Sequence, residues 1–195
     1  ISEQIEKAEL TVILEELEQV LGSKVAGDVC EFGCFIGTTS LFLQRLLLGS
    51  GQKKKLYIYD SFEGLPAKSL RDESAKGVDF IEGELMATKS QLKLNFKKAN
   101  LPFPKVKKAW FSDLKPKDIP KKICFAFLDG DFYESIKSPL ALIKDNLQPG
   151  AVIIIDDYDN PALPGAKLAT DQFLTSNPEF ELKKITSSLA IIKKV

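Results

Sequence analysis

Apolar, strand-like runs alternate along this chain with segments that read as helices, and this alternation limits the fold more than any other feature. The strand-like runs lie at 28–34, 55–60, 105–111, 123–130 and 150–157. Helices are expected at 38–50, 85–100, 133–147 and 165–177. Strand–helix–strand units form right-handed crossovers, so the chain is predicted to build a mostly parallel sheet covered by helices on both faces.

The two ends of the chain complete this α/β, doubly wound, Rossmann-like architecture. Residues 2–23 carry apolar residues at helical spacing and predict a helix that ends at Gly22. The runs 179–186 and 188–194 look like a hairpin, which would add an antiparallel strand at one edge. A length of 195 residues suits a single domain, residues 1–195. The polar stretch 61–84 is long for a connection, and such loops are usually functional or mobile.

Composition narrows the class of partner. Lys+Arg and Asp+Glu both count 27, and this balance disfavours nucleic acid and an anionic membrane surface. No apolar run approaches the roughly 18 residues of a membrane span, and no signal peptide is visible, so we expect a cytoplasmic protein. The three cysteines read as buried thiols of a reducing compartment. The chain contains no histidine and no CxxC pair, which disfavours zinc.

Acidic residues and a glycine turn follow several of the predicted strands. In open α/β sheets, ligands bind beyond the carboxyl ends of the strands, near the point where the strand order reverses. The features expected to meet at this rim are the turn 31–37 and Asp60, Asp129, Asp131, Asp156 and Asp157.

The turn EFGCFIG at 31–37 predicts a site for a ligand with positive charge. Gly33 permits a tight turn and Gly37 a close approach, while the next helix begins with free N–H groups. The pattern lacks the third glycine of a dinucleotide site, and Glu31 would repel a pyrophosphate. S-adenosylmethionine fits that charge pattern better than NAD. Asp60, at the end of the second strand, either accepts ribose hydroxyls or caps a turn, and the first role is favoured because the turn supports it.

Six stretches together resemble the macrocin-type O-methyltransferases, a family of class I S-adenosylmethionine-dependent enzymes that often methylate deoxysugars of antibiotics. The stretches, spread over residues 25 to 175, are GDVCEFGCFIGTTS, YIYDSFEGLP, KAWFSDL, FLDGDFYES, PGAVIIIDDY and PGAKLATDQF. The resemblance implies a Rossmann-like sheet of seven strands with an antiparallel last strand. The chain departs from the family pattern at Ala109, where a glycine is usual. Its region 1–24 is also short, and members of the family often build a lid or a dimer contact there. A homo-oligomer is therefore left open, and so is whether the N-terminus is complete, since the chain opens on Ile.

The resemblance also implies residue roles. It implies a divalent ion, Mg²⁺ or another hard ion such as Ca²⁺ or Mn²⁺, held by Asp129, Asp156 and Asp157, with Asp131 as general base. The residues implied on the cofactor side are Glu31, Gly33, Gly37, Thr38, Asp60, Ser61, Phe62 and Asp129, and Asp113 is a candidate for the adenine amino group.

The chemistry of the carboxylates agrees with a hard ion. Oxygen ligands without His or Cys suit Mg²⁺ or Ca²⁺. Asp156 and Asp157 are neighbours, so both can face one ion only if the strand ends between them. A metal would lower the pKa of an acceptor hydroxyl, and crowded carboxylates would raise the pKa of Asp131 toward that of a useful base. Alternatively, Asp131 is an N-cap, and we expect Glu134 to complete a capping box with it.

The function expected from these features is O-methylation of a small-molecule hydroxyl. Two alternatives are a nucleotide-sugar or NAD-binding enzyme and an S-adenosylmethionine-binding module without catalysis. Asp113 could instead cap a turn, Tyr133 suits either the core or a pocket wall, and Trp110 and Phe111 are more often core residues.

Overall fold

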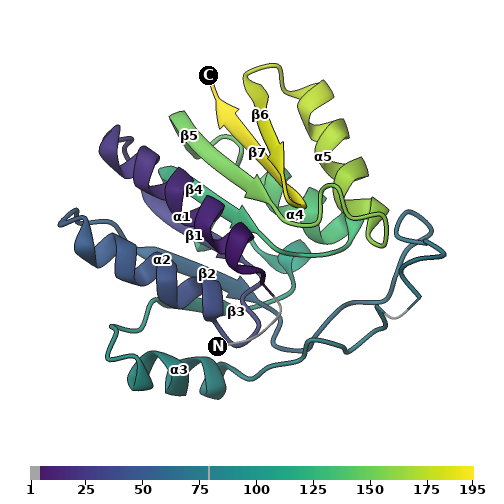
Figure 1. Cartoon of the computed structure of the whole chain (residues 1–195), viewed down its shortest axis with the longest axis horizontal. Coiled ribbons are helices and arrows are strands. Elements are labelled where there is room, and N and C mark those ends of the chain that lie inside the picture. Colours follow the sequence, from purple (N-terminus) through teal and green to yellow (C-terminus); the bar gives the residue numbers. More distant parts are fainter. Residues whose placement is uncertain (1–4, 79) are drawn as a thin grey trace.

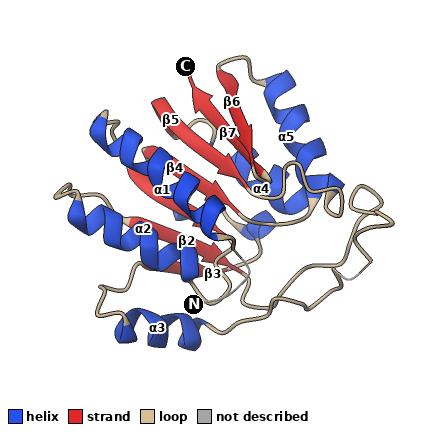
Figure 2. Cartoon of the chain, viewed as in Figure 1, coloured by secondary structure: helices blue, strands red, loops and turns tan. Residues whose placement is uncertain are grey.

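The computed structural model describes residues 5–78 and 80–195, which fold into one seven-stranded sheet flanked by helices (Figures 1 and 2). The strand order is β3-β2-β1-β4-β5-β7-β6. The parallel strands are β1 (Asp28–Phe32), β2 (Leu56–Asp60), β3 (Lys105–Lys108), β4 (Ile123–Leu128) and β5 (Leu147–Ile155). The hairpin of β6 (Phe180–Thr186) and β7 (Leu189–Lys194) pairs antiparallel to β5. The predicted fold class is confirmed.

Two layers of helices cover the sheet. α1 (Lys7–Gly22), α2 (Thr38–Gly49) and α3 (Lys89–Lys98) contribute to one apolar cluster, with residues such as Ile13, Leu43 and Phe96. α4 (Tyr133–Ile143) and α5 (Pro164–Ser176) contribute to another cluster on the opposite face, with Ile136 and Ala169. All six residues of β4 are buried, because this strand lies in the middle of the sheet between both layers.

Several predicted boundaries were wrong, among them the end of α4, which is Ile143 rather than residue 147. β3 ends at Lys108 rather than at residue 111, because the chain turns into two short 3₁₀ helices, Phe111–Asp113 and Pro116–Asp118. α3 begins at Lys89 rather than near residue 85, and the hydroxyl of Thr88 caps it by accepting from Gln91 N–H. β5 begins at Leu147, earlier than predicted.

The carboxyl ends of β1 and β4 mark the point where the strand order reverses. From β1 the chain adds β2 and β3 on one side, and then crosses to β4 and β5 on the other. The segment 61–88 between β2 and α3 has neither helix nor strand among its described residues. It extends from this edge of the sheet toward α4 and α5 (Figure 1).

Within the described residues, no helix has both the length and the apolarity that crossing a membrane would require.

Candidate active site at the carboxyl edge of the sheet

A cavity of about 390 Å³ opens at the carboxyl edge where β1, β2, β4 and β5 end. Three kinds of residues line it: the glycine turn after β1, a set of acids, and apolar or aromatic residues from the following loops. The lining residues are Glu9, Gly33, Cys34, Phe35, Asp60, Ser61, Gly64, Leu65, Pro66, Phe80, Leu85, Trp110, Phe111, Ser112, Asp129, Gly130, Asp131, Glu134, Ser135, Asp156, Asp157 and Ser188. A cavity of this size suits a small-molecule ligand.

Gly33 sets the shape of the first turn. Its φ of 88° lies in the left-handed region, and a Cβ at this position would come within 1.8 Å of the carbonyl oxygen of Asp129. Only glycine allows β1 and β4 to end this close together. The turn therefore brings the end of β1 against Asp129, the acid that directly follows β4.

Asp60 joins the ends of β1 and β2. Its Oδ2 accepts from Cys34 N–H at 2.8 Å and from Phe35 N–H at 3.3 Å, and its Oδ1 accepts from Phe62 N–H at 2.6 Å. The turn-capping role considered from the sequence is therefore present. Asp60 also lines the cavity, and a carboxylate oxygen has a second lone pair for a ligand hydroxyl.

Glu31 lies behind the turn and does not line the cavity. Its side chain is fully buried, Ser40 Oγ donates to one carboxylate oxygen, and the other oxygen has no partner among the described residues. Burial raises the pKa of Glu31 to about 8, although the bond from Ser40 opposes this shift. At pH 7 the carboxyl is therefore mostly neutral, and the carboxyl groups that face the cavity at this turn are those of Asp60 and Asp129.

Four other residues expected on the cofactor side do not line the cavity. Gly37 is the N-cap of α2, with a φ of 90°, and faces Leu92. Thr38 begins α2, and Phe62 is buried in the apolar cluster with that helix. Asp113 is exposed at the end of a 3₁₀ helix, whereas its neighbours Trp110, Phe111 and Ser112 line the cavity. Trp110 and Phe111, for which a core position was favoured from the sequence, are only partly buried.

The acids after β4 and β5 come together as the strand-end rule predicts. Asp129, Asp156 and Asp157 each offer a carboxylate oxygen, and these atoms lie within 4.8 Å of one another. β5 ends at Ile155, and Asp157 adopts a φ of 55°, so the backbone turns between the two neighbouring acids. Burial raises the pKa of Asp129 and of Asp156 well above the ordinary range, and the neighbouring carboxylates raise both further.

Asp131 stands beside this cluster in a left-handed conformation, with a φ of 61°. Its side chain is 8% exposed and lines the cavity. Burial, and then the charge of Asp157, raise the pKa of Asp131 to about 7. A carboxyl with this pKa can exchange a proton near neutral pH, which an ordinary aspartate does poorly.

The expected capping box at α4 was wrong. The N-cap is Phe132, which provides no side-chain cap, so Asp131 is not the capping residue. Glu134 lines the cavity instead and pairs with Lys137 at 3.2 Å and Arg71 at 3.8 Å. Tyr133 is a core residue whose hydroxyl donates to Gln172 Oε1 at 2.7 Å.

Sequence reasoning missed two residues at the far side of the cavity. Ser188, in the β6–β7 turn, donates its hydroxyl proton to Glu9 Oε1 at 2.6 Å, although the two lie 179 positions apart. The charge of Glu9 contributes to the raised pKa of both Asp156 and Asp157. The only sequence signal was that Glu9 lies in the first turn of an amphipathic helix, which gives no partner.

A doubly wound seven-stranded sheet with an antiparallel last strand, a glycine turn and acids at the central strand ends defines a Rossmann-like fold of the methyltransferase type. The solved O-methyltransferase NovP superposes with a TM-score of 0.80 and 25% identity, over 95% of this chain and 79% of NovP. The calicheamicin methyltransferase CalS11 superposes with a TM-score of 0.78 and 21% identity, over 96% of this chain and 80% of that chain.

The chain belongs to the Macrocin-O-methyltransferase (TylF) family, whose model matches residues 4–193. A Streptomyces olivaceus relative, 8-demethyl-8-(2,3-dimethoxy-alpha-L-rhamnosyl)-tetracenomycin-C 4'-O-methyltransferase, is 32% identical over 148 residues, 73% of this chain and 57% of the relative. The demethyldecarbamoylnovobiocin O-methyltransferase of Streptomyces niveus is 24% identical over 163 residues, 80% of this chain and 62% of the relative. The matches thus span about three-fifths of the length of these relatives.

Proposed function

We propose that this chain transfers a methyl group from S-adenosylmethionine to a hydroxyl of a small molecule. We infer that this hydroxyl belongs to a sugar of a natural product. The observation that carries the proposal is that one cavity is lined by two sets of residues, which we assign to the two reactants and call its two halves. The glycine turn and Asp60 form one half, and Asp131 with the three clustered acids forms the other. A methyl donor and a hydroxyl acceptor need such adjoining sites, because direct transfer requires both reactants in line.

The first half suits S-adenosylmethionine. The glycine turn lines the cavity, and Asp60 Oδ1, which accepts a single hydrogen bond, retains a lone pair for a ribose hydroxyl. Trp110 and Phe111 provide aromatic surface for an adenine ring. A pyrophosphate would meet the carboxylates of Asp60 and Asp129, which argues against NAD.

The second half suits a hard divalent ion, and Asp129, Asp156 and Asp157 would hold it. Their oxygens lie within reach of one another. Burial, and then the neighbouring carboxylates, raise the pKa of Asp129 and of Asp156, and a cation bound there would stabilise the ionised carboxylates. Carboxylate oxygens favour Mg²⁺, Ca²⁺ or Mn²⁺. When bound, such an ion supplies Lewis-acid stabilisation of a developing alkoxide.

Asp131 is proposed to take the proton of the acceptor hydroxyl. It lines the cavity beside the acidic cluster, and its pKa of about 7 suits a general base at neutral pH. Asp131 reaches the cavity from a turn in which its own backbone is left-handed.

The lining favours an uncharged acceptor. Seven acids line the cavity, namely Glu9, Asp60, Asp129, Asp131, Glu134, Asp156 and Asp157, and no Lys or Arg lies among the described lining residues. Leu65, Phe80 and Leu85 add apolar surface for the rest of a glycoside. The relatives are named for a rhamnosyl tetracenomycin and for a novobiocin precursor, and we infer an acceptor of this chemical class.

Transfer of an isotopically labelled methyl group from S-adenosylmethionine to a panel of neutral glycosides tests the proposal. We expect label in at least one glycoside with Mg²⁺ present, and loss of transfer after EDTA. An unchanged rate in EDTA would remove the ion from the account. Binding of the cofactor without any transfer would favour a binding module without catalysis.

A further inference from the structure

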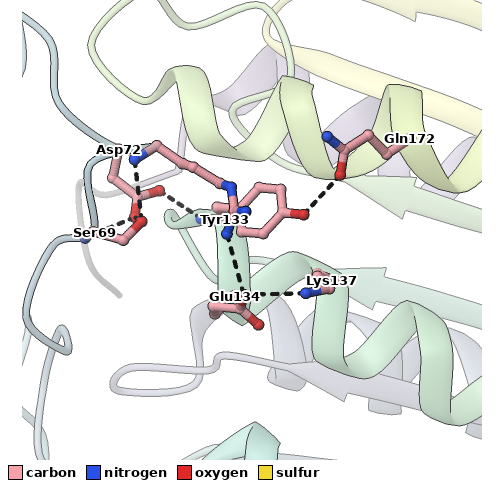
Figure 3. A network of polar contacts seen from close by, with 7 residues as sticks. Ser69, Asp72, Tyr133, Glu134, Lys137 and Gln172 are labelled. Carbon is pink, nitrogen blue, oxygen red and sulfur yellow. Dashed lines mark hydrogen bonds and ion pairs between the residues drawn. The ribbon is translucent and has the colours of Figure 1, made fainter.

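A buried carboxylate fastens the segment 61–88 to the first turn of α4. Asp72 is 2% exposed, and its Oδ1 accepts from Tyr133 N–H at 2.6 Å. Its Oδ2 accepts from Ser69 N–H at 3.0 Å and from Ser69 Oγ at 2.6 Å (Figure 3). We call these three hydrogen bonds the Asp72 anchor.

The Asp72 anchor replaces a local helix cap. Phe132, the N-cap of α4, offers no side-chain acceptor, so Tyr133 N–H would otherwise be unpaired. Asp72, 61 positions away in the sequence, accepts a hydrogen bond from this N–H and places its carboxylate at the N-terminus of α4. A cap from a distant loop couples the position of that loop to the start of the helix.

The packing leaves little freedom around this carboxylate. A Cβ on Gly165, near the start of α5, would lie 1.9 Å from Asp72 Oδ1 and 2.7 Å from Tyr133 N. The side chain of Tyr133 is held as well, because Arg71 lies over its ring at 4.4 Å. Gln172 accepts a hydrogen bond from the hydroxyl of Tyr133 at 2.7 Å (Figure 3). Segment 61–88 and α5 therefore both contact α4 at Tyr133.

Three consecutive residues connect the Asp72 anchor to the cavity. Asp131 lines the cavity, Phe132 packs with Leu65 in an apolar cluster, and Tyr133 is bonded to Asp72. Phe132 N–H also donates to the carbonyl oxygen of Gly130 at 2.6 Å, which tightens the turn that holds Asp131. Segment 61–88 itself lines the cavity through Leu65 and Phe80.

We propose that Asp72 is a positioning residue for the transfer reaction, and this inference rests on the proposed function. The Asp72 anchor fixes the position of Asp131 relative to the apolar residues of segment 61–88 that line the cavity, Leu65, Phe80 and Leu85. Asp72 does not line the cavity, so it acts only through these neighbours.

Hydrogen exchange and kinetics of Asp72→Ala test the proposal together. With S-adenosylhomocysteine bound, we expect faster amide exchange in segment 61–88 and at the start of α4. We also expect kcat to fall about 10- to 100-fold, a size typical of misplaced catalytic groups, while KM for S-adenosylmethionine stays within about twofold. Asp72→Asn keeps an acceptor for Tyr133 N–H and should recover part of kcat.

The matched control is Asp118→Ala. Asp118 also accepts a backbone N–H within a loop turn, from Lys115 at 3.0 Å, but does not line the cavity. This variant should leave kcat unchanged. Should Asp72→Ala not fold, Ser69→Ala removes one bond of the anchor and should give smaller changes in the same directions.

The outcomes separate the two proposals. Unchanged amide hydrogen exchange in Asp72→Ala contradicts the coupling by the Asp72 anchor, whatever value of kcat is measured. Faster exchange with unchanged kcat reduces Asp72 to a structural role and overturns the positioning. A wild-type protein that binds S-adenosylhomocysteine but transfers to no acceptor contradicts the proposed function, and exchange still decides whether the anchor exists.

Discussion

At the scale of single residues, Asp131 combines a buried carboxylate with a left-handed backbone and a pKa of about 7. Asp131→Asn should lower kcat by about 10²- to 10⁴-fold, because an amide cannot take the acceptor proton. The Kd of S-adenosylhomocysteine should stay within about twofold. Asp159→Asn, at an exposed acid outside the cavity, provides the control. Retained turnover in Asp131→Asn would reject it as the base.

The raised pKa of Glu31 predicts how the stability of the protein depends on pH. Its folded pKa of about 8 lies above the ordinary value of 4.5, so its contribution to stability is present at acidic pH and lost as the pH rises through about 8. Glu31→Gln removes this titration. The variant should gain stability relative to the wild type between pH 5 and pH 8, by up to a few kcal/mol, on the order of 1.4 kcal/mol per pKa unit. Thermal unfolding of both ligand-free proteins measures the difference, and a constant difference would contradict the assignment.

At the scale of elements, the approach of β1 to β4 depends on Gly33. Gly33→Ala would bring a Cβ to 1.8 Å from the carbonyl oxygen of Asp129 and strain a φ of 88°. We expect a lower unfolding temperature and weaker binding of S-adenosylhomocysteine, because both sides of the cavity would shift. Gly22→Ala is the matched control, since a Cβ there meets nothing within 4 Å at the end of α1. It should be neutral or stabilise by about 0.5–1 kcal/mol. Equal effects of the two substitutions would contradict this account.

The elements and the rim could be predicted because each depends on local pattern. Continuous apolar runs indicate buried strands, and parallel strands bring their carboxyl ends to one edge, which placed Asp129, Asp156 and Asp157 together. The contacts of segment 61–88 could not be predicted, because its anchor, Asp72 to Tyr133, joins residues 61 positions apart. The hydrogen bond between Glu9 and Ser188 joins residues still farther apart, at 179 positions. Burial also changed the expected charge of Glu31, and a sequence pattern does not report burial depth.

At the scale of the whole molecule, equal numbers of basic and acidic residues conceal an uneven distribution of charge. Seven acids line the cavity, with no basic residue among its described lining. We therefore expect a neutral aryl rhamnoside to be methylated at least tenfold more efficiently, by kcat/KM, than thymidine diphosphate rhamnose, about 1.4 kcal/mol in favour of the uncharged acceptor. A preference for the nucleotide sugar would contradict the inferred acceptor class.

The cavity at the carboxyl edge of the sheet is expected to bind S-adenosylmethionine rather than a dinucleotide. Calorimetric titration of the purified protein with S-adenosylhomocysteine and, separately, with NAD tests it most directly, because neither ligand requires a known acceptor. We expect saturable binding of S-adenosylhomocysteine at the cavity and no heat of binding with NAD. Tight binding of NAD, with none of S-adenosylhomocysteine, would contradict it.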